Sequence, residues 1–469
     1  MQATALKMQT YIGLFLLSAA ALAICGAFYW HNMLYPACCD SLGYAIIAGS
    51  IQEHGLFHWQ VHERTYGYPL FLSLILPQDT ASLPQYGYFL SNVAATQSLL
   101  YVGACFALFF VLRRTNGKVA WCTAAGLLLS PFILNCVALQ LTEGLIASLT
   151  VGLVTVVCAL SLRTLTSAQA CCLVFVGSLF AGYAMEVRPA SIVLTLAWAV
   201  FLLVALRYLP PSRFAWIVCA ALGLALPIGL QVALNYVLFD QPSPFPAQLG
   251  KEQLEWGLSL MKYGTYLEGD GTPTLLFPNS FFSAPDIKRW GAWLYVAQPL
   301  RGTATVLAHL FNSIDHGTFF TYAYDLRPWY RIPLNTLNHT MIFAAAFGIG
   351  RWLLERLPSW RCGSFASSDA IAIFLLIAVA GTCAINSVSA VETRFGLMIF
   401  GLAAPLAIYG ILEWGALAAR GRLVSGLGCL VYVMLALLAS GQILDQAIPH
   451  GDMRALMRPA RMETTSPSP

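Results

Sequence analysis

An aspartate directly follows the first long apolar run of the chain, in the stretch YPACCDSLGY at 35–44. If a helix covers 39–54, Asp40 and Tyr44 lie one turn apart on the same face. The apolar residues of that segment make the helix amphipathic, so we expect it to lie in the membrane interface. A carboxylate held there could accept a proton as a general base. The alternative is a structural role, because aspartate is a favoured helix N-cap.

A second carboxylate, Glu143 in LQLTEGLIASL, falls between two apolar runs. A carboxylate near membrane depth is costly and therefore indicates a functional site. The alternative is local: Thr142 would be the N-cap of the next helix, with Glu143 in its first turn.

Two arginines begin later apolar runs, Arg188 in GYAMEVRPASIVL and Arg394 in VETRFGLM. The planar guanidinium group can hold a phosphate through paired hydrogen bonds. For Arg188 the alternative is a side chain that snorkels to the interface. For both arginines a second alternative is a local ion pair, with Glu186 and Glu392 respectively, which contributes little if it is exposed.

A metal site has little support in the sequence. His62 and Glu63 precede RTYGYPLFLSLILP at 64–77, whose Gly67 and Pro69 break the helix and whose apolar run is expected to re-enter the membrane partway. These two side chains are weak candidates for metal ligands. The thirteen cysteines and the other histidines show no ligand spacing. We therefore predict no metal site formed by side chains of this chain.

Composition defines the class of protein. Of 469 residues, 58% are hydrophobic and 10% are charged, whereas soluble domains carry about 25% charged residues. The first run ends in bulky aromatics without a cleavage pattern, so it is predicted to be a retained span. The net charge of +4, without a basic cluster, gives no indication of nucleic-acid binding. The sequence predicts an all-α polytopic membrane protein with eleven spans, at 11–30, 89–112, 119–138, 144–162, 168–186, 190–208, 214–238, 335–354, 370–388, 396–416 and 424–442.

The loop charges predict the topology. Short loops rich in arginine and lysine define one side of the membrane. The other side takes two long segments, 31–88 and 239–334, and a tail from 443, and it holds nearly all the acids, Glu143, Glu186 and Glu392 included. The positive-inside rule predicts a cytoplasmic amino terminus and an outer face that carries the acids. We expect the 239–334 loop to form short helices on that face. The predicted division is 1–238 (transmembrane module with catalytic loops 31–88 and 139–143), 239–334 (outer loop), 335–442 (C-terminal spans) and 443–469 (outer tail).

In their order, these motifs resemble the GT-C superfamily of membrane glycosyltransferases, which includes protein O-mannosyltransferases and the lipid A aminoarabinose transferase. The resemblance spans about 30 to 400, and its first motif departs from the family at Ser41, where relatives often carry a second acid. Matching positions are Asp40 with Tyr44, Gly67-Tyr68-Pro69, Glu143, Arg188-Pro189, Asn235-Tyr236, and Glu392, Arg394 and Phe395.

The resemblance implies inverting transfer of a sugar from a polyprenyl-phosphate carrier to an acceptor hydroxyl on a glycan, lipid or protein. It implies that Asp40 is the base, with Glu143 as the second catalytic acid. It also implies a bacterial inner membrane, with the active site on the periplasmic face. Members differ in their use of a divalent cation, so metal use stays open. The substrate-binding residues it implies are Tyr44, Glu63, Tyr68, Arg188, Asn235, Tyr236, Glu392 and Arg394.

Two other functions stay open. A polymerase or ligase of O-antigen type would also use a large outer loop, but with arginines leading the chemistry and no early aspartate motif. A transporter or flippase of lipid-linked sugars would carry ionisable residues in mid-span and paired repeats. Charged residues here lie mainly at the edges of the spans.

Overall fold

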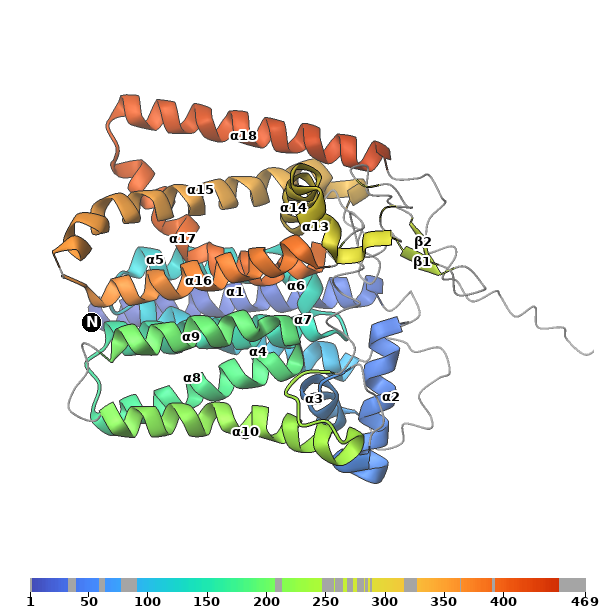
Figure 1. Ribbon diagram of the computed structural model, residues 1–469. Coiled ribbons are helices and arrows are strands. Elements are labelled where there is room, and N and C mark those ends of the chain that lie inside the picture. Colours follow the sequence, from blue (N-terminus) through green and yellow to red (C-terminus); the bar gives the residue numbers. More distant parts are fainter. Residues whose placement is uncertain are drawn as a thin grey trace, which may run out of the picture.

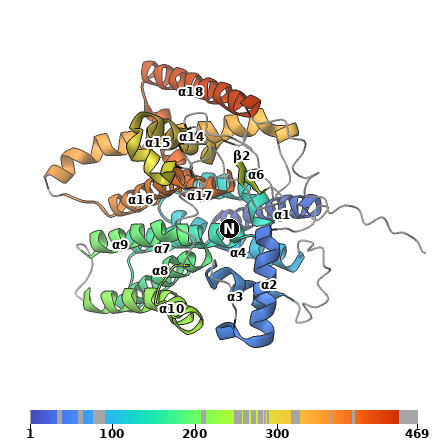
Figure 2. The same ribbon diagram turned by 45° about the vertical axis from the view of Figure 1, so that its right-hand side comes forward.

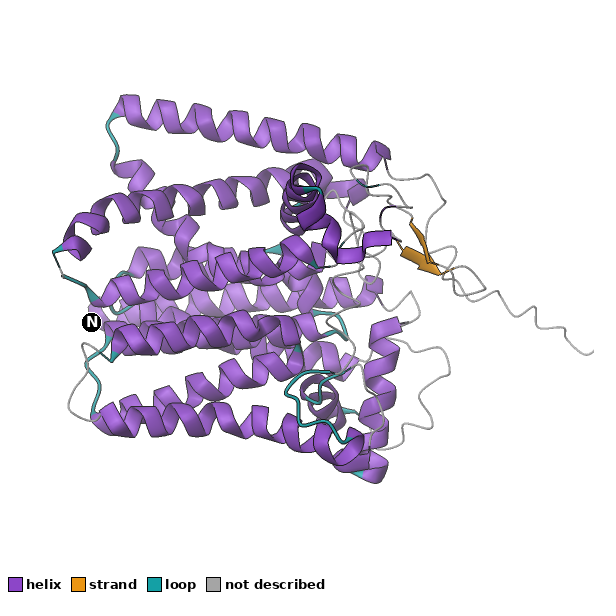
Figure 3. Cartoon of the chain, in the orientation of Figure 1, coloured by secondary structure: helices purple, strands orange, loops and turns teal. Residues whose placement is uncertain are grey.

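The computed structural model describes residues 2–32, 39–58, 64–76, 91–206, 213–246, 257, 265–267, 273–275, 282, 286, 289–315, 327–362, 364–389 and 393–446. Helices dominate this part of the chain, which confirms the all-α membrane class (Figure 3). The described strands are β1 (Thr265–Leu267) and β2 (Pro273–Leu275), an antiparallel pair with Tyr266 opposite Thr274. Among the described residues, eight helices are long and apolar enough to cross a membrane, or nine with one bent pair.

Each of the eleven predicted spans falls mainly on helical residues where the structure describes it. The predicted span 119–138 is the bent pair, which turns by 56° between α5 and α6. The bend falls where Ser130 caps the N-terminus of α6 and Pro131 opens it. The helices of this set are α1 (Gln2–Asn32), α4 (Ser91–Leu112), α5 (Gly117–Leu128), α6 (Pro131–Val137), α7 (Thr142–Leu162), α8 (Ser167–Val187), α9 (Ile192–Ala205), α10 (Arg213–Phe239), α15 (Arg327–Arg361), α16 (Ser367–Val388), α17 (Leu397–Ala416) and α18 (Ala419–Gln446).

The long helices run side by side and alternate in direction (Figure 1). The turns that follow α4, α7, α15 and α17 lie at the same end as the amino terminus, and these are the turns rich in basic residues. The starts of α2, α7 and α17 and the end of α8 lie at the opposite end, hereafter the Asp40 end. The predicted separation of basic loops from the acidic motifs is therefore present in the fold.

Shorter helices gather at the Asp40 end and run across the direction of the spans (Figures 1 and 2). The helix predicted at 39–54 is α2, with those same bounds. The run expected to re-enter the membrane forms α3, which lies crosswise to the spans beside α2. The described part of the long loop contributes short helices at this end, as predicted. These elements are α2 (Cys39–His54), α3 (Gly67–Ile75), α13 (Leu294–Ala297) and α14 (Pro299–Ile314), with the 3₁₀ turns η1 (Leu56–His58), η3 (Pro189–Ser191), η5 (Gly291–Trp293) and η6 (Thr393–Gly396).

Small residues allow the spans to pack closely, as is usual where helices associate in lipid. The central helix is α7, which contacts α4, α8, α16 and α17. On α8, a Cβ added to Gly177 would lie 2.5 Å from the indole ring of Trp198 on α9, so only glycine leaves room for that ring. The indole Nε1 of Trp198 also donates to Ser178 Oγ at 2.8 Å.

A buried polar cluster fixes the last helix against the others. Ser440 on α18 donates to Asp315 Oδ2 at 2.9 Å and accepts from Asn335 Nδ2 on α15 at 3.2 Å. The other oxygen of Asp315 lies 3.4 Å from His339 Nε2. Because unpaired polar groups are costly in a buried setting, this cluster ties the C-terminal end of α14 to α15 and α18.

Candidate active site

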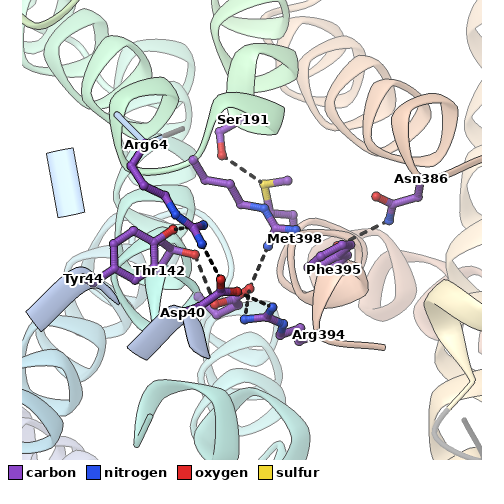
Figure 4. A network of polar contacts seen from close by, with 11 residues as sticks. Asp40, Tyr44, Arg64, Thr142, Ser191, Asn386, Arg394, Phe395 and Met398 are labelled. Atoms are coloured by element: carbon purple, nitrogen blue, oxygen red, sulfur yellow. Dashed lines mark hydrogen bonds and ion pairs between the residues drawn. The ribbon is translucent and has the colours of Figure 1, made fainter. Parts of the chain in front are cut away.

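Asp40 lies in the first turn of α2, and two arginines approach its carboxylate. Arg64 Nη2, from the segment before α3, is 2.5 Å from Oδ1, and Arg394 Nη2 from η6 is 3.0 Å from Oδ2. Figure 4 shows Asp40 between these two guanidinium groups. The side chain of Asp40 is 15% exposed, whereas that of Arg394 is 3% exposed. Asp40 is thus not the N-cap of α2, which begins at Cys39.

Glu143 is the second residue of α7, and its carboxylate is also shared. Its Oε1 accepts from Arg188 Nη1 at 2.9 Å and lies 3.5 Å from Arg394 Nη1. Its Oε2 accepts from Thr142 Oγ1 at 3.1 Å. Leu141, rather than Thr142, occupies the N-cap position of α7. Glu143 does lie in the first turn of a helix, as the local alternative held, but its side chain binds two arginines from other elements.

Arg394 therefore connects the two carboxylates through its two terminal nitrogens. Phe395 lies under both neighbouring cations, with the guanidinium carbon of Arg188 at 4.1 Å and that of Arg394 at 5.3 Å from its ring centre. Such stacking stabilises a cation further. The backbone oxygen of Phe395 accepts from Asn386 Nδ2 on α16 at 3.3 Å. The turn that carries Arg394 is thereby held in place.

Tyr44 and Tyr68 pack against each other beside Asp40. Their rings meet edge to face with centres 5.0 Å apart, and the hydroxyl of Tyr44 accepts from Arg64 Nη1 at 3.2 Å. Tyr68 is fully buried and donates to Gln97 Oε1 at 3.1 Å. The Gln97 amide donates in turn to the backbone oxygens of Val137 and Leu139, at 3.1 and 2.5 Å. A continuous set of contacts thus links the helix of Asp40 to the segment that leads into Glu143.

Burial and neighbouring charges shift the pKa values of Tyr44 and Arg64, the two groups beside Asp40. Burial raises the pKa of the Tyr44 phenol, and the nearby guanidinium of Arg64 only partly opposes this. Burial works to lower the pKa of Arg64, but the Tyr44 and Asp40 oxygens outweigh it and the pKa ends above its usual value. Tyr44 is therefore a neutral phenol and Arg64 a fixed cation over the physiological range.

The structure gathers five of the sequence-predicted site residues into one cluster: Asp40, Tyr44, Glu143, Arg188 and Arg394. Their roles in a reaction stay predictions.

The other predicted residues lie around this cluster or away from it. Tyr68 packs edge to face against Tyr44. Asn235 Nδ2 binds the backbone oxygens of Ser243 and Phe245, so it shapes the turn after α10. Tyr236 is 58% exposed on α10. Glu63 and Glu392 fall outside the described residues.

The proposed local pair of Arg188 with Glu186 is wrong, because Arg188 binds Glu143 instead. Glu186 is fully buried on α8, and neither of its carboxylate oxygens has a hydrogen-bond partner among the described residues. The pair proposed between Arg394 and Glu392 involves a residue outside the described part.

Sequence reasoning missed Arg64, which makes the shortest contact to Asp40. Its segment RTYGYP was noted for Gly67, Tyr68 and Pro69 only, and a basic residue two dozen positions after the aspartate was the available signal. It also missed Gln97 and Gln140. The Gln140 amide donates to the backbone oxygen of Ser41 at 3.2 Å and joins the Glu143 segment to α2.

Metal ligation has no support in the described part of the chain, where no group of three or more His, Cys, Asp or Glu side chains is arranged to hold an ion. The fold and site define a polytopic helical membrane protein with a carboxylate–guanidinium cluster at one end of its bundle.

Comparisons with known proteins returned solved structures alone. No protein-family model and no curated protein matches the sequence. The structure is similar to that of the oligosaccharyltransferase of Archaeoglobus fulgidus in its apo form, with a TM-score of 0.48 and 14% identity over 93% of this chain and 54% of that one. It is also similar to the archaeal oligosaccharyltransferase AglB from the same organism in complex with an inhibitory peptide and a dolichol-phosphate, with a TM-score of 0.47 and 11% identity over 92% and 55%.

Both neighbours are archaeal oligosaccharyltransferases. The chain spans about half the length of the solved proteins it matches. Identities and TM-scores of this size say nothing of substrate or chemistry, which rest on the geometry of the site itself.

Proposed function

We propose that this protein is a glycosyltransferase that moves a sugar from a polyprenyl-phosphate carrier to an acceptor hydroxyl, with inversion at the anomeric carbon. The observation that carries the proposal is the cluster in which Arg394 joins Asp40 to Glu143 at one end of a membrane-spanning bundle. Three guanidinium groups and two carboxylates meet there, which leaves one positive charge in excess. An excess of fixed positive charge favours an anionic substrate.

Asp40 is the proposed base. An acceptor hydroxyl has a high pKa and loses its proton only as its oxygen attacks. In the proposed step the oxygen forms a bond to the anomeric carbon, the proton passes to Asp40, and the bond from that carbon to the phosphate oxygen breaks. Asp40 is the better exposed of the two acids and so the one an acceptor can reach.

The leaving group is a lipid phosphate that gains negative charge as the bond breaks. Arg188 and Arg394 both lie within contact of Glu143 and stack on Phe395, so their positions are fixed before a donor arrives. Fixed donors directed at developing charge are an effective means of lowering a reaction barrier. Glu143 would then orient these two cations.

The position at a helix-bundle end suits a donor whose tail stays in lipid. A polyprenyl chain would lie against the apolar spans, and its phosphate would be at the level of the helix ends that bear Arg188 and Arg394. We further propose that this end faces the extracytoplasmic side of a bacterial inner membrane, as the basic loops of the other end favour. The acceptor would be a glycan, a lipid or a protein.

Transfer by the purified protein tests the proposal. The wild type in detergent is given radiolabelled polyprenyl-phosphate hexoses and pentoses together with envelope extract of a strain lacking the gene, and product and free polyprenyl phosphate are measured. Product must form with at least one donor, and Asp40→Asn must lose at least about a hundredfold in rate, the lower range of a lost general base.

The matched control is Glu355→Gln, which removes an ion-paired carboxylate, 2.7 Å from Arg351, on α15 near the opposite end. It should retain wild-type transfer. An Asp40→Asn variant with full activity would remove Asp40 as the base. If no donor gives product while a deletion strain shows unchanged surface glycans by mass spectrometry, the proposed reaction is wrong.

A further inference from the structure

All four carboxylate oxygens of the candidate site are already engaged by protein donors. Asp40 Oδ1 binds Arg64 and Oδ2 binds Arg394. Glu143 Oε1 binds Arg188 and lies near Arg394, and Oε2 binds Thr142. A pair of acids that share one substrate site would ordinarily repel each other. Here a guanidinium group stands between them.

Arg394 is arranged as a bridge. Its Nη2 contacts Asp40 at 3.0 Å and its Nη1 lies 3.5 Å from Glu143, so one planar cation serves both acids. The side chain is 3% exposed. Its turn is fixed by the bond from Asn386 to Phe395 and by Gly396, which packs so tightly against the backbone oxygen of Ser313 that no Cβ would fit. The bridge is therefore built into the fold.

A divalent ion does not fit these residues. Magnesium and similar ions take about six oxygen ligands at roughly 2.0–2.6 Å. Guanidinium groups of the chain contact three of the four carboxylate oxygens, and the Thr142 hydroxyl contacts the fourth. Two further positive charges would also stand among three guanidinium groups that already exceed the acids in number. Coulomb repulsion at this range opposes such an ion.

We propose that Arg394 does for this site what a divalent cation does for a site built on two acids, and that the protein works without a bound metal. Arg394 holds Asp40 and Glu143 together and offers its charge to the leaving phosphate. The part of this inference that concerns the reaction rests on the proposed function. The part that concerns metal binding does not, because it can be measured on the protein alone.

Manganese binding tests the inference without any substrate. MnCl₂ is titrated into purified protein in detergent, and free Mn²⁺ is followed by electron paramagnetic resonance. The wild type should show no saturable site. Arg394→Met leaves the two acids facing each other without their shared cation, and it should gain one Mn²⁺ site that is lost again in the double variant with Asp40→Asn.

Arg188→Met is the matched control, since it removes an arginine from Glu143 but leaves the bridge intact. It should gain no Mn²⁺ site. A wild-type Mn²⁺ site that disappears in Asp40→Asn would overturn the inference. So would a folded Arg394→Met that binds no Mn²⁺, because Arg394 would then not stand in the place of an ion.

A second measurement needs no variant. If the wild type transfers sugar, extensive treatment with EDTA should leave the rate unchanged, and a rate that falls with EDTA and returns with Mn²⁺ would overturn the inference. If Arg394→Met fails to fold, the EDTA measurement and the Mn²⁺ titration of the wild type still test the inference. Absence of transfer with every donor counts against the proposed function alone, since the Mn²⁺ titration requires no sugar transfer.

Discussion

Arg394 Nη2 lies 3.0 Å from Asp40 Oδ2, although 354 positions separate the two residues in the chain. The contact joins the turn before α17 to the first turn of α2, and so connects the C-terminal spans to the crosswise helices of the amino-terminal part. Because the same guanidinium also reaches Glu143 at 3.5 Å, the site exists only when both parts are folded together. Changes on either side should therefore affect the same chemistry.

Arg64 should orient Asp40 and contribute charge for the donor. Arg64→Met removes the 2.5 Å contact to Asp40 and the contact to Tyr44. We expect transfer to fall by about ten- to a hundredfold, as for the loss of one charge-assisted contact of about 1.5–3 kcal/mol. Arg64→Lys should recover only part of the rate, since an ammonium group lacks the fork that reaches both partners.

Steady-state kinetics with varied donor checks this expectation. The control is Arg301→Met, which removes an exposed cation of α14 that binds Gln298. Wild-type kcat and KM for Arg64→Met would show that the contact to Asp40 plays no part in transfer.

Glu143 should matter for both stability and activity. Glu143→Gln leaves Arg188 beside a neutral group in a nearly closed site, and breaking a buried ion pair in this way costs about 3–5 kcal/mol. Transfer should fall with it, because Arg188 and Arg394 lose the group that orients them. Thr142→Val is the graded comparison, since it removes only the hydroxyl donor to Oε2 and should cost about 1 kcal/mol.

Thermal unfolding in detergent, followed by intrinsic fluorescence, measures the stability of the two variants. Glu143→Gln should have the lower unfolding midpoint and Thr142→Val the higher. Equal midpoints for Glu143→Gln and the wild type would mean that the Arg188 pair contributes nothing to the fold.

The sequence was informative about the site because its acids and arginines stand at the edges of apolar runs. Spans of this length alternate in direction, so Asp40, Glu143, Arg188 and Arg394 were expected at one end, and they are found there. Which acid pairs with which arginine was not predictable. Arg188 turns away from Glu186, two residues before it, because the packing of α7 on α8 brings Glu143 within 2.9 Å.

The contact of Arg64 and the course of α3 could not be predicted from the sequence pattern. Arg64 lies in a turn where neither helical spacing nor hydropathy restricts its partner, and only the tertiary position of α2 brings it to Asp40. The crosswise course of α3 was missed for a similar reason. Its apolar residues fit a re-entrant segment equally well, and nothing in the pattern shows that Gly67 packs against the backbone of α8.

Gly67 should accept no side chain. A Cβ there would lie 2.5 Å from the carbonyl carbon and oxygen of Glu186, and the backbone of α8 cannot give way as a flexible side chain would. The Gly67 oxygen also accepts from the Tyr183 hydroxyl at 2.8 Å. Gly67→Ala should destabilise the protein by about 1–3 kcal/mol, as overpacking does, and should lower transfer by shifting Arg64.

Gly43→Ala is the paired control for this change. It lies on α2 close to Asp40, and a Cβ there meets nothing within 4 Å. Thermal midpoints of the two variants should differ clearly, with Gly43→Ala at or above the wild type because alanine favours helix. Equal midpoints would show that α3 does not depend on its close approach to α8.

Stability should fall at alkaline pH because two buried phenols cannot ionise in the folded state. Burial is the main cause that raises the pKa of Tyr44 and of Tyr68 above the ordinary value of 10.0. The unfolded chain releases these protons near pH 10 while the folded chain keeps them. The contribution of each phenol is therefore fully present below pH 10, and it is lost as the pH rises from there towards the folded pKa. The slope is at most about 1.4 kcal/mol per pH unit for each group.

Midpoints of thermal unfolding measured from pH 8 to pH 11 should show this decline in the wild type, a shallower one in Tyr44→Phe and in Tyr68→Phe, and the shallowest in the double variant. Tyr68→Phe should start from a lower midpoint at pH 8, since it also loses the bond to Gln97. Parallel curves for all four proteins would mean that neither phenol is held neutral by the fold.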